Sequence, residues 1–124
     1  MALYDDIGGA PAVRAALNAF YARVLADATL SPFFLGADIE RLKQAQERFF
    51  AVSMGGPSAY GGRSLLDAHA RARRRGVNET AFDHFLTVFK RVLIDLRIPT
   101  AKVGEWLAVL EGARGQILDR EEHP

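Results

Sequence analysis

The sequence contains no cysteine among its 124 residues, which excludes disulfide bonds, thiolate metal sites and cysteine nucleophiles. An excess of one charge is also missing, because 16 Lys and Arg against 15 Asp and Glu leave a net charge of +1. No overall field therefore favours nucleic acid or an anionic membrane. No apolar run is long enough to cross a bilayer, and the acidic N-terminus lacks the basic start and apolar middle of a secretion signal. We expect a cytoplasmic protein.

The motifs of hydrolytic and nucleotide-binding enzymes are absent as well. The sequence has no nucleophile elbow, no phosphate-binding glycine loop and no set of ligands at zinc spacing. Its three glycine pairs, Gly8-Gly9, Gly55-Gly56 and Gly61-Gly62, lack the strand that a dinucleotide fingerprint requires. We interpret these pairs as junctions between elements.

Apolar residues recur at helical spacing nearly everywhere, and the strict alternation of strands is missing. Hydrophobic residues make up 49% of the chain and charged residues 25%, as in globular proteins. A length of 124 residues suffices for one core and not for two ordinary ones. The sequence therefore predicts an all-α protein with one domain, residues 1–124.

In the first half of the chain, Pro11 suits the first turn of a helix. Its apolar face is predicted to hold Val13, Leu17, Phe20, Tyr21, Val24 and Leu25. Ser31-Pro32 starts a short helical piece with Phe33 and Phe34. Asp38 is the expected cap of the next helix, which ends at Gly55-Gly56-Pro57. The buried stripe of that helix is predicted to be Leu42, Gln46, Phe49 and Phe50.

In the second half, Leu65, Leu66 and His69 share one face of a short predicted helix, followed by a polar loop over residues 71–78. Thr80 and Asp83 fit a capping box. The long helix after them has an apolar face formed by Phe82, Phe85, Leu86, Phe89, Leu93 and Leu96. A last helix begins at Pro99-Thr100, with an apolar face formed by Val103, Trp106, Leu107, Leu110 and Ile117.

His69 is the histidine with the strongest claim to a functional role. His123 lies in the charged C-terminal tail, where we expect a solvated side chain, and His84 is expected to be a partly buried structural residue. His69 follows Leu66 on an apolar face. Such a histidine is either a hydrogen-bonded core residue or a ligand to a metal or haem iron.

The chain is rich in phenylalanine, with eight residues that often occur as pairs. Flat, rigid rings at helical spacing form either an ordinary core or the walls of a slot for a large planar ligand. Tyr21 and Gln46 interrupt apolar helix faces, and buried polar groups need partners. They either bond each other or the backbone, or they point at a bound ligand.

In its order of motifs the sequence resembles the truncated haemoglobins of group I over residues 3–118. The matching segments are Ile7-Gly8-Gly9, residues 20–27, residues 30–34, Arg41-Leu42-Lys43 with Gln46, Phe49-Phe50, Gly55-Gly56-Pro57 with Tyr60, and Ala68-His69. The resemblance implies a two-over-two helical sandwich around haem. It implies a heme b cofactor whose iron is ligated by His69.

The resemblance also assigns the remaining site residues. Tyr21 and Gln46 correspond to the distal pair that hydrogen-bonds a ligand on the iron, and Leu42 stands where longer globins keep a distal histidine. Lys43 and Arg71 are implied partners of the haem propionates. The apolar residues implied to line the pocket are Phe20, Phe33, Phe34, Phe49, Phe50, Leu66 and Phe85.

The sequence departs from the family pattern at three places. Ala45 replaces a histidine that ligates iron in some relatives, so we expect five-coordinate ferrous haem. Phe85 is bulkier than the usual aliphatic residue, which narrows the expected gas tunnel. Residues 71–75 are unusually basic, and without interleaved aromatic residues we expect propionate pairing or solvation rather than nucleic-acid binding.

Several functions share these residues. The first is reversible binding of oxygen, NO and CO; the second is nitric oxide dioxygenase activity, which needs a separate electron-donating reductase. A haem-based gas sensor is a third. A helical interaction module without cofactor, acting through residues 71–75, is the alternative from another class. We expect a monomer, because no self-complementary apolar patch is evident.

Overall fold

The structure is a computed structural model that describes residues 2–55 and 78–118. These residues form helices and no strand, as the sequence predicts. The helices are α1 (Leu3–Asp6), α2 (Gly9–Leu25), the 3-10 helix η1 (Ser31–Phe34), α3 (Ile39–Ser53), α6 (Glu79–Asp95) and α7 (Thr100–Leu118). None of the described helices is both long and apolar enough to span a membrane.

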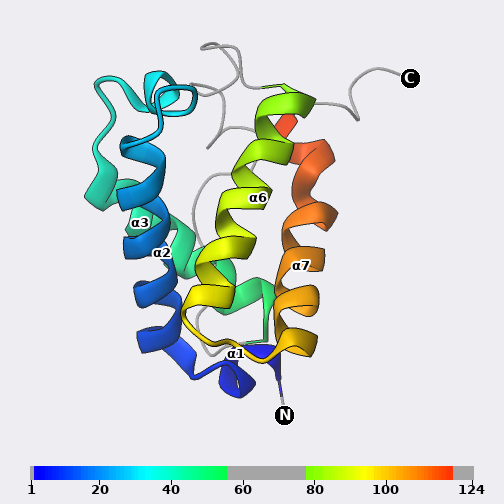
Figure 1. The fold of residues 1–124 in the computed structure, drawn as a ribbon. Coiled ribbons are helices and arrows are strands. Elements are labelled where there is room, and N and C mark those ends of the chain that lie inside the picture. Colours follow the sequence, from blue (N-terminus) through cyan, green and yellow to red (C-terminus); the bar gives the residue numbers. More distant parts are fainter. Residues whose placement is uncertain (1, 56–77, 119–124) are drawn as a thin grey trace.

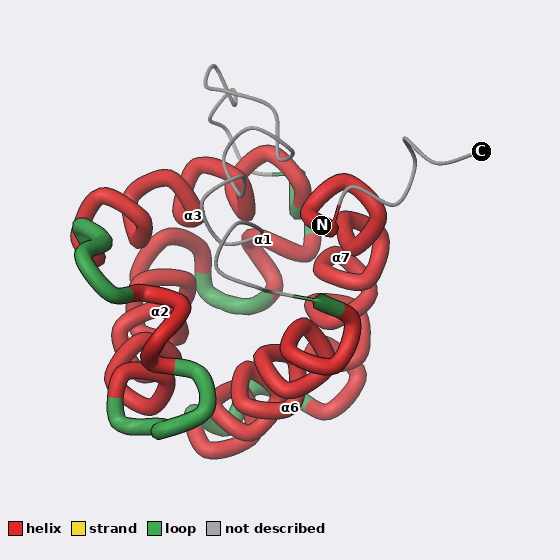
Figure 2. Tube along the Cα trace, turned by 90° about the horizontal axis from the view of Figure 1, so that it is seen from above, coloured by secondary structure: helices red, strands yellow, loops and turns green. Residues whose placement is uncertain are grey.

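The long helices are arranged as two pairs around a shared interior. Helix α2 packs against both α3 and α6, and α6 packs against α7. In Figure 1, α2, α6 and α7 stand side by side with α3 crossing behind α2. The view from above in Figure 2 places α3 and α7 on one side and α2 and α6 on the other.

Aromatic side chains join three of these helices in the core. Phe50 of α3, Phe89 of α6 and Trp106 of α7 contact one another, with ring centroids 5.4–6.0 Å apart. All three are buried. Aromatic pairs in such edge-on and stacked arrangements add roughly 0.5–1.5 kcal/mol beyond the burial of their surface.

The predicted helix starts are confirmed in part. Asp38 caps α3, because its side chain accepts a hydrogen bond from the backbone N–H of Arg41 at 3.2 Å. The predicted capping box of Thr80 and Asp83 is wrong. Asn78 caps α6 instead, accepting from the N–H of Ala81 at 3.0 Å, so the helix begins before Thr80.

The apolar faces are also shorter than predicted. Leu25 and Leu96 are 45% and 40% exposed; Leu25 is the last residue of α2, and Leu96 is the C-cap of α6. Along α3 only Phe50 and Ala51 are buried. The other three positions of its predicted stripe, Leu42, Gln46 and Phe49, are half-buried.

Helix α1 was not predicted, and a glycine explains how it packs. The N–H of Tyr4 donates to the carbonyl of Met54 at 3.0 Å, which ties α1 to the end of α3. Gly55 has a φ of +81°, and a Cβ there would lie 2.9 Å from the Cβ of Ala2. Only glycine fits this close approach without strain.

Arg114 connects α7 to the start of α6. Its side chain is mostly buried and contacts carboxylates of Glu111 at 2.7 Å, Glu79 at 2.8 Å and Asp83 at 2.6 Å. The guanidinium also lies 4.6 Å from the ring centroid of Phe82. The hydrogen bonds to Glu111 and then to the other two carboxylates raise the pKa of Arg114 above its ordinary value.

We predict that Arg114→Met lowers the free energy of unfolding by about 1–3 kcal/mol. The loss stays at this level because the three carboxylates are at least half exposed and can be solvated once the cation is gone. Urea denaturation measures the change. Arg41→Met at an exposed position is the matched control, and equal stability of both variants would show that Arg114 does not clamp α6 to α7.

Candidate functional site

Tyr21 of α2, which is buried, and Gln46 of α3, which is half-buried, form a polar pair. Tyr21 is 1% exposed, and its hydroxyl shares a hydrogen bond with the side chain of Gln46. Burial raises the pKa of Tyr21 well above its ordinary value, and the bond to Gln46 offsets only part of this shift. The phenol therefore stays protonated and able to donate a hydrogen bond at any physiological pH.

Aromatic rings from three elements surround Tyr21. Phe20 of α2 and Phe34 of η1 meet its ring edge-on, with centroids at 5.3 and 5.6 Å. Phe85 of α6 contacts Phe34 at 5.8 Å and Phe33 at 5.9 Å. The polar pair thus stands in an apolar aromatic corner where α2, η1 and α6 meet.

Four of the apolar side chains that the resemblance assigns to the pocket are less buried than the core. Phe34, Leu42, Phe49 and Phe85 pack against the core but remain half-buried, whereas Phe50 is buried against Phe89 and Trp106. The partly exposed apolar side chains can pack against a flat, largely apolar group. The protonated hydroxyl beside them can donate a hydrogen bond to a polar ligand at the centre of that group. The donor set and the rings therefore fit haem.

Lys43 lies on α3, one turn before Gln46. Its ammonium lies 3.4 Å from the carboxylate of Glu40, and its side chain is 19% exposed. Among the other residues implied by the resemblance, His69, Leu66 and Arg71 lie outside the described residues. Their roles stay predictions.

The structure adds a pair of residues that the sequence analysis did not connect. Asp27 accepts hydrogen bonds from the backbone N–H groups of Thr29 at 2.8 Å and Leu30 at 3.1 Å. Its second oxygen lies 3.3 Å from Nε2 of His84 on α6. These contacts of Asp27 stabilise the turn that leads into η1, and with it the position of Phe34. An Asp two residues before a Thr is a recognisable turn signal, but the partner on α6 is visible only in the fold.

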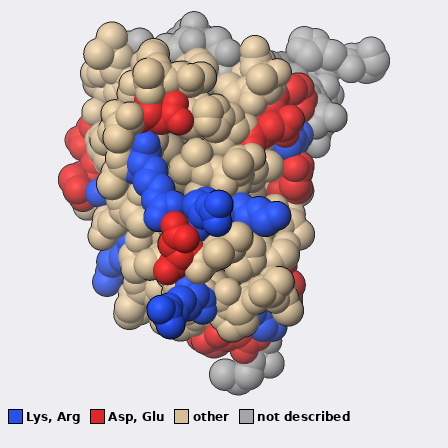
Figure 3. All heavy atoms as spheres, viewed as in Figure 1, with Lys and Arg blue, Asp and Glu red and all other residues tan. Residues whose placement is uncertain are grey.

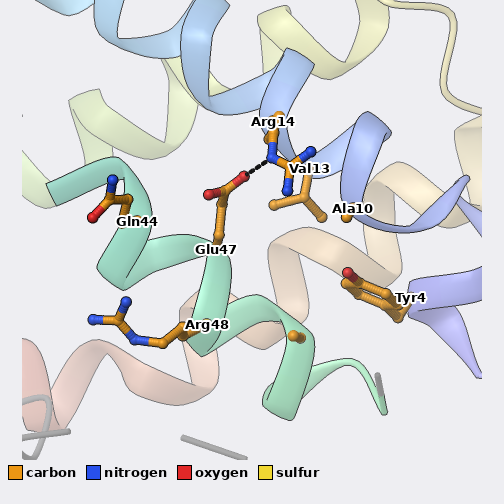
Figure 4. A pocket seen from close by; sticks show the side chains of 8 residues that line it. Tyr4, Ala10, Val13, Arg14, Gln44, Glu47 and Arg48 are labelled. Atoms are coloured by element: carbon orange, nitrogen blue, oxygen red, sulfur yellow. Dashed lines mark ion pairs between the residues drawn. The ribbon is translucent and has the colours of Figure 1, made fainter. Parts of the chain in front are cut away.

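A separate hollow of about 270 Å³ lies on the outside of the α1, α2 and α3 junction (Figure 4). Arg14 and Glu47 meet there, with Nε and Oε1 2.6 Å apart, and Tyr4 lines its other side. None of the residues that line it belongs to the aromatic corner around Tyr21. This hollow is distinct from the candidate site.

Comparison with known proteins agrees with this geometry. A model of the family described as bacterial-like globin matches residues 2–118. The group 1 truncated hemoglobin GlbN of Mycolicibacterium paratuberculosis is 36% identical over 119 residues, covering 96% of this chain and 85% of that protein. A group 1 truncated hemoglobin of Tetrahymena pyriformis is 29% identical and covers 95% of both chains.

Solved structures give the same result for the fold. The 2/2 hemoglobin of Synechococcus sp. PCC 7002, in its cyanomet state with covalently attached heme, superimposes with a TM-score of 0.89 at 30% identity, covering 96% of this chain and 99% of that one. The Fe(III) form of the Tetrahymena pyriformis truncated hemoglobin gives 0.85 at 29% identity, covering 95% and 98%. The chain therefore belongs to the bacterial-like globin family: it has the two-over-two fold of the truncated haemoglobins, and its cofactor is haem.

Proposed function

We propose that this globin reversibly binds oxygen, and also NO and CO, at five-coordinate haem iron ligated by His69. The pair formed by the buried Tyr21 and the half-buried Gln46 beside the aromatic rings is the observation that carries the proposal. When bound, haem supplies an iron with one coordination position open to a diatomic ligand. The protein's own side chains must hold the haem and hydrogen-bond its ligand.

Tyr21 and Gln46 supply the polar side of the pocket. Their mutual hydrogen bond satisfies both groups while no ligand is present. A ligand that carries partial negative charge can accept from the Tyr21 hydroxyl, and the Gln46 amide can hold that hydroxyl in position or donate itself. Hydrogen bonds with such charge assistance contribute roughly 1.5–3 kcal/mol.

The half-buried apolar residues hold the cofactor. Phe34, Leu42, Phe49 and Phe85 offer the open surface against which a macrocycle can pack. Phe50 supports this wall from the core, and Leu66 joins it in our proposal. Lys43 and Arg71 are the proposed propionate partners. Ala45 has no ligating atom, so this residue would leave the iron open to the gas.

Oxygen binding and release by the holoprotein test the proposal. We expect a reversible oxygen complex and, for Gln46→Leu, oxygen dissociation roughly 2–10-fold faster, because one hydrogen bond contributes about 0.5–1.5 kcal/mol. Stopped-flow displacement of oxygen by CO measures the rate. Gln44→Leu, two positions earlier on the exposed side of α3, is the matched control and should leave the rate unchanged. Failure of the wild type to form any oxygen complex would overturn the proposal.

A further inference from the structure

The outward side of α6 and the turn after it carry a cluster of cations. Lys90, Arg91 and Arg97 are exposed there. Arg23 of α2 joins them, because its guanidinium lies 2.6 Å from Asp95 on the same helix. Figure 3 shows Lys and Arg side chains running as a band across this side of α2 and α6. We call these four cations, with Ile94, the α6 basic face.

The charge of this face is not balanced locally. Asp95 pairs with Arg23, whereas Lys90, Arg91 and Arg97 form no ion pair with the described part of the chain. The face is thus strongly positive on a protein whose net charge is only +1. A local field of this kind steers an oppositely charged partner and fixes its orientation.

Arg97 occupies a strained backbone position. Its φ is +63°, and it follows the last turn of α6, where Arg97 N–H bonds to Ile94 and Ile98 N–H bonds to Leu93. This pattern is the Schellman motif, whose left-handed position usually holds glycine. Because glycine would be less strained at this position, the presence of arginine indicates a function for its side chain.

An apolar side chain lies among the cations. Ile94 is 45% exposed. An exposed aliphatic side chain within a ring of charges suits a protein–protein interface, in which the apolar centre is desolvated and the charged rim sets orientation. Binding to a polyanion alone would not require Ile94.

The same helix connects this face with the haem site. Phe85 and Phe89 on its inner side belong to the aromatic corner and core, about one helix diameter, roughly 10–12 Å, from the outer side. Reversible oxygen binding requires ferrous iron, so a donor must restore any iron that becomes ferric. A partner docked on α6 would lie close enough to the haem to reduce the ferric iron.

We propose that the α6 basic face docks an acidic one-electron carrier protein that keeps the haem iron ferrous. The carrier loses one electron and the ferric iron gains it, with no bond made or broken in the protein. The electron-transfer part of this inference rests on the proposed function. The docking part rests on the charges, the strained Arg97 and the exposed Ile94.

Docking is tested by binding measurements on the holoprotein with a reduced plant-type [2Fe–2S] ferredoxin as the acidic probe. We expect binding that weakens steeply with salt and a Kd at least tenfold higher for the double variant Lys90→Gln/Arg91→Gln. The double variant Arg41→Gln/Arg48→Gln removes the same charge from exposed positions of α3 and should change the Kd less than twofold. Equal weakening by both would overturn the proposal, as would binding to anionic vesicles or DNA without binding to the ferredoxin.

Arg97→Gly separates docking from folding. The substitution relieves the left-handed backbone, so its Tm should equal or exceed that of the wild type while its Kd for the ferredoxin rises severalfold. Unchanged docking by this variant would contradict the role of Arg97. Oxygen binding after chemical reduction with dithionite tests the proposed function separately, because it needs no docked partner.

Discussion

Replacing Tyr21 by phenylalanine is expected to speed oxygen dissociation roughly 10–150-fold. In the proposed function the Tyr21 hydroxyl donates to the bound ligand, and a charge-assisted hydrogen bond contributes about 1.5–3 kcal/mol. Because burial keeps the pKa of Tyr21 above its ordinary value, the donor is present across the usual pH range. The rate is measured by stopped-flow replacement of oxygen with CO.

Tyr4→Phe is the matched control for this experiment. Tyr4 lies on α1 and lines the outer hollow rather than the aromatic corner, so its variant should release oxygen at the wild-type rate. CO carries less negative charge than bound oxygen, and its dissociation from Tyr21→Phe should change far less. Oxygen release unchanged by Tyr21→Phe would remove this residue from the distal role.

The second large effect is expected for His69→Gly. Without the imidazole we expect the protein to lose most of its haem on gel filtration and to regain its visible spectrum when free imidazole is added, because the small ligand can occupy the space left by the side chain. His123→Gln, which changes the histidine expected to be solvated in the charged C-terminal tail, should retain haem fully. Complete haem retention with an unaltered spectrum in His69→Gly would exclude His69 as the iron ligand.

Local patterns predicted the helices well because helical periodicity and side-chain caps are properties of neighbouring residues. Asp38 caps α3 as expected. The cap of α6 was misassigned because Asn78 and Thr80 both have side chains that can cap, and only the observed bond of Asn78 to Ala81 decides between them. The short α1 was missed because it is held by Met54, about fifty positions along the chain.

From the residue patterns without the resemblance, the site was predicted only as alternatives, and the fold separates several of them. Phenylalanines could form a core or a pocket wall. Phe50 and Phe89 are core, while Phe34, which contacts Tyr21, and Phe85, which contacts Phe34, stay half-buried. Tyr21 and Gln46 do bond each other, and their role toward a ligand stays a prediction. The contact between Asp27 and His84 depends on tertiary packing and could not be predicted.

The visible absorption spectrum of the purified protein, expressed with haem available, tests the central claim most directly. The account predicts a strong Soret band in the ferric form, a five-coordinate ferrous spectrum after reduction, and a sharp shift of the band when CO is added. A colourless, stably folded protein whose spectrum does not respond to added haemin would contradict it.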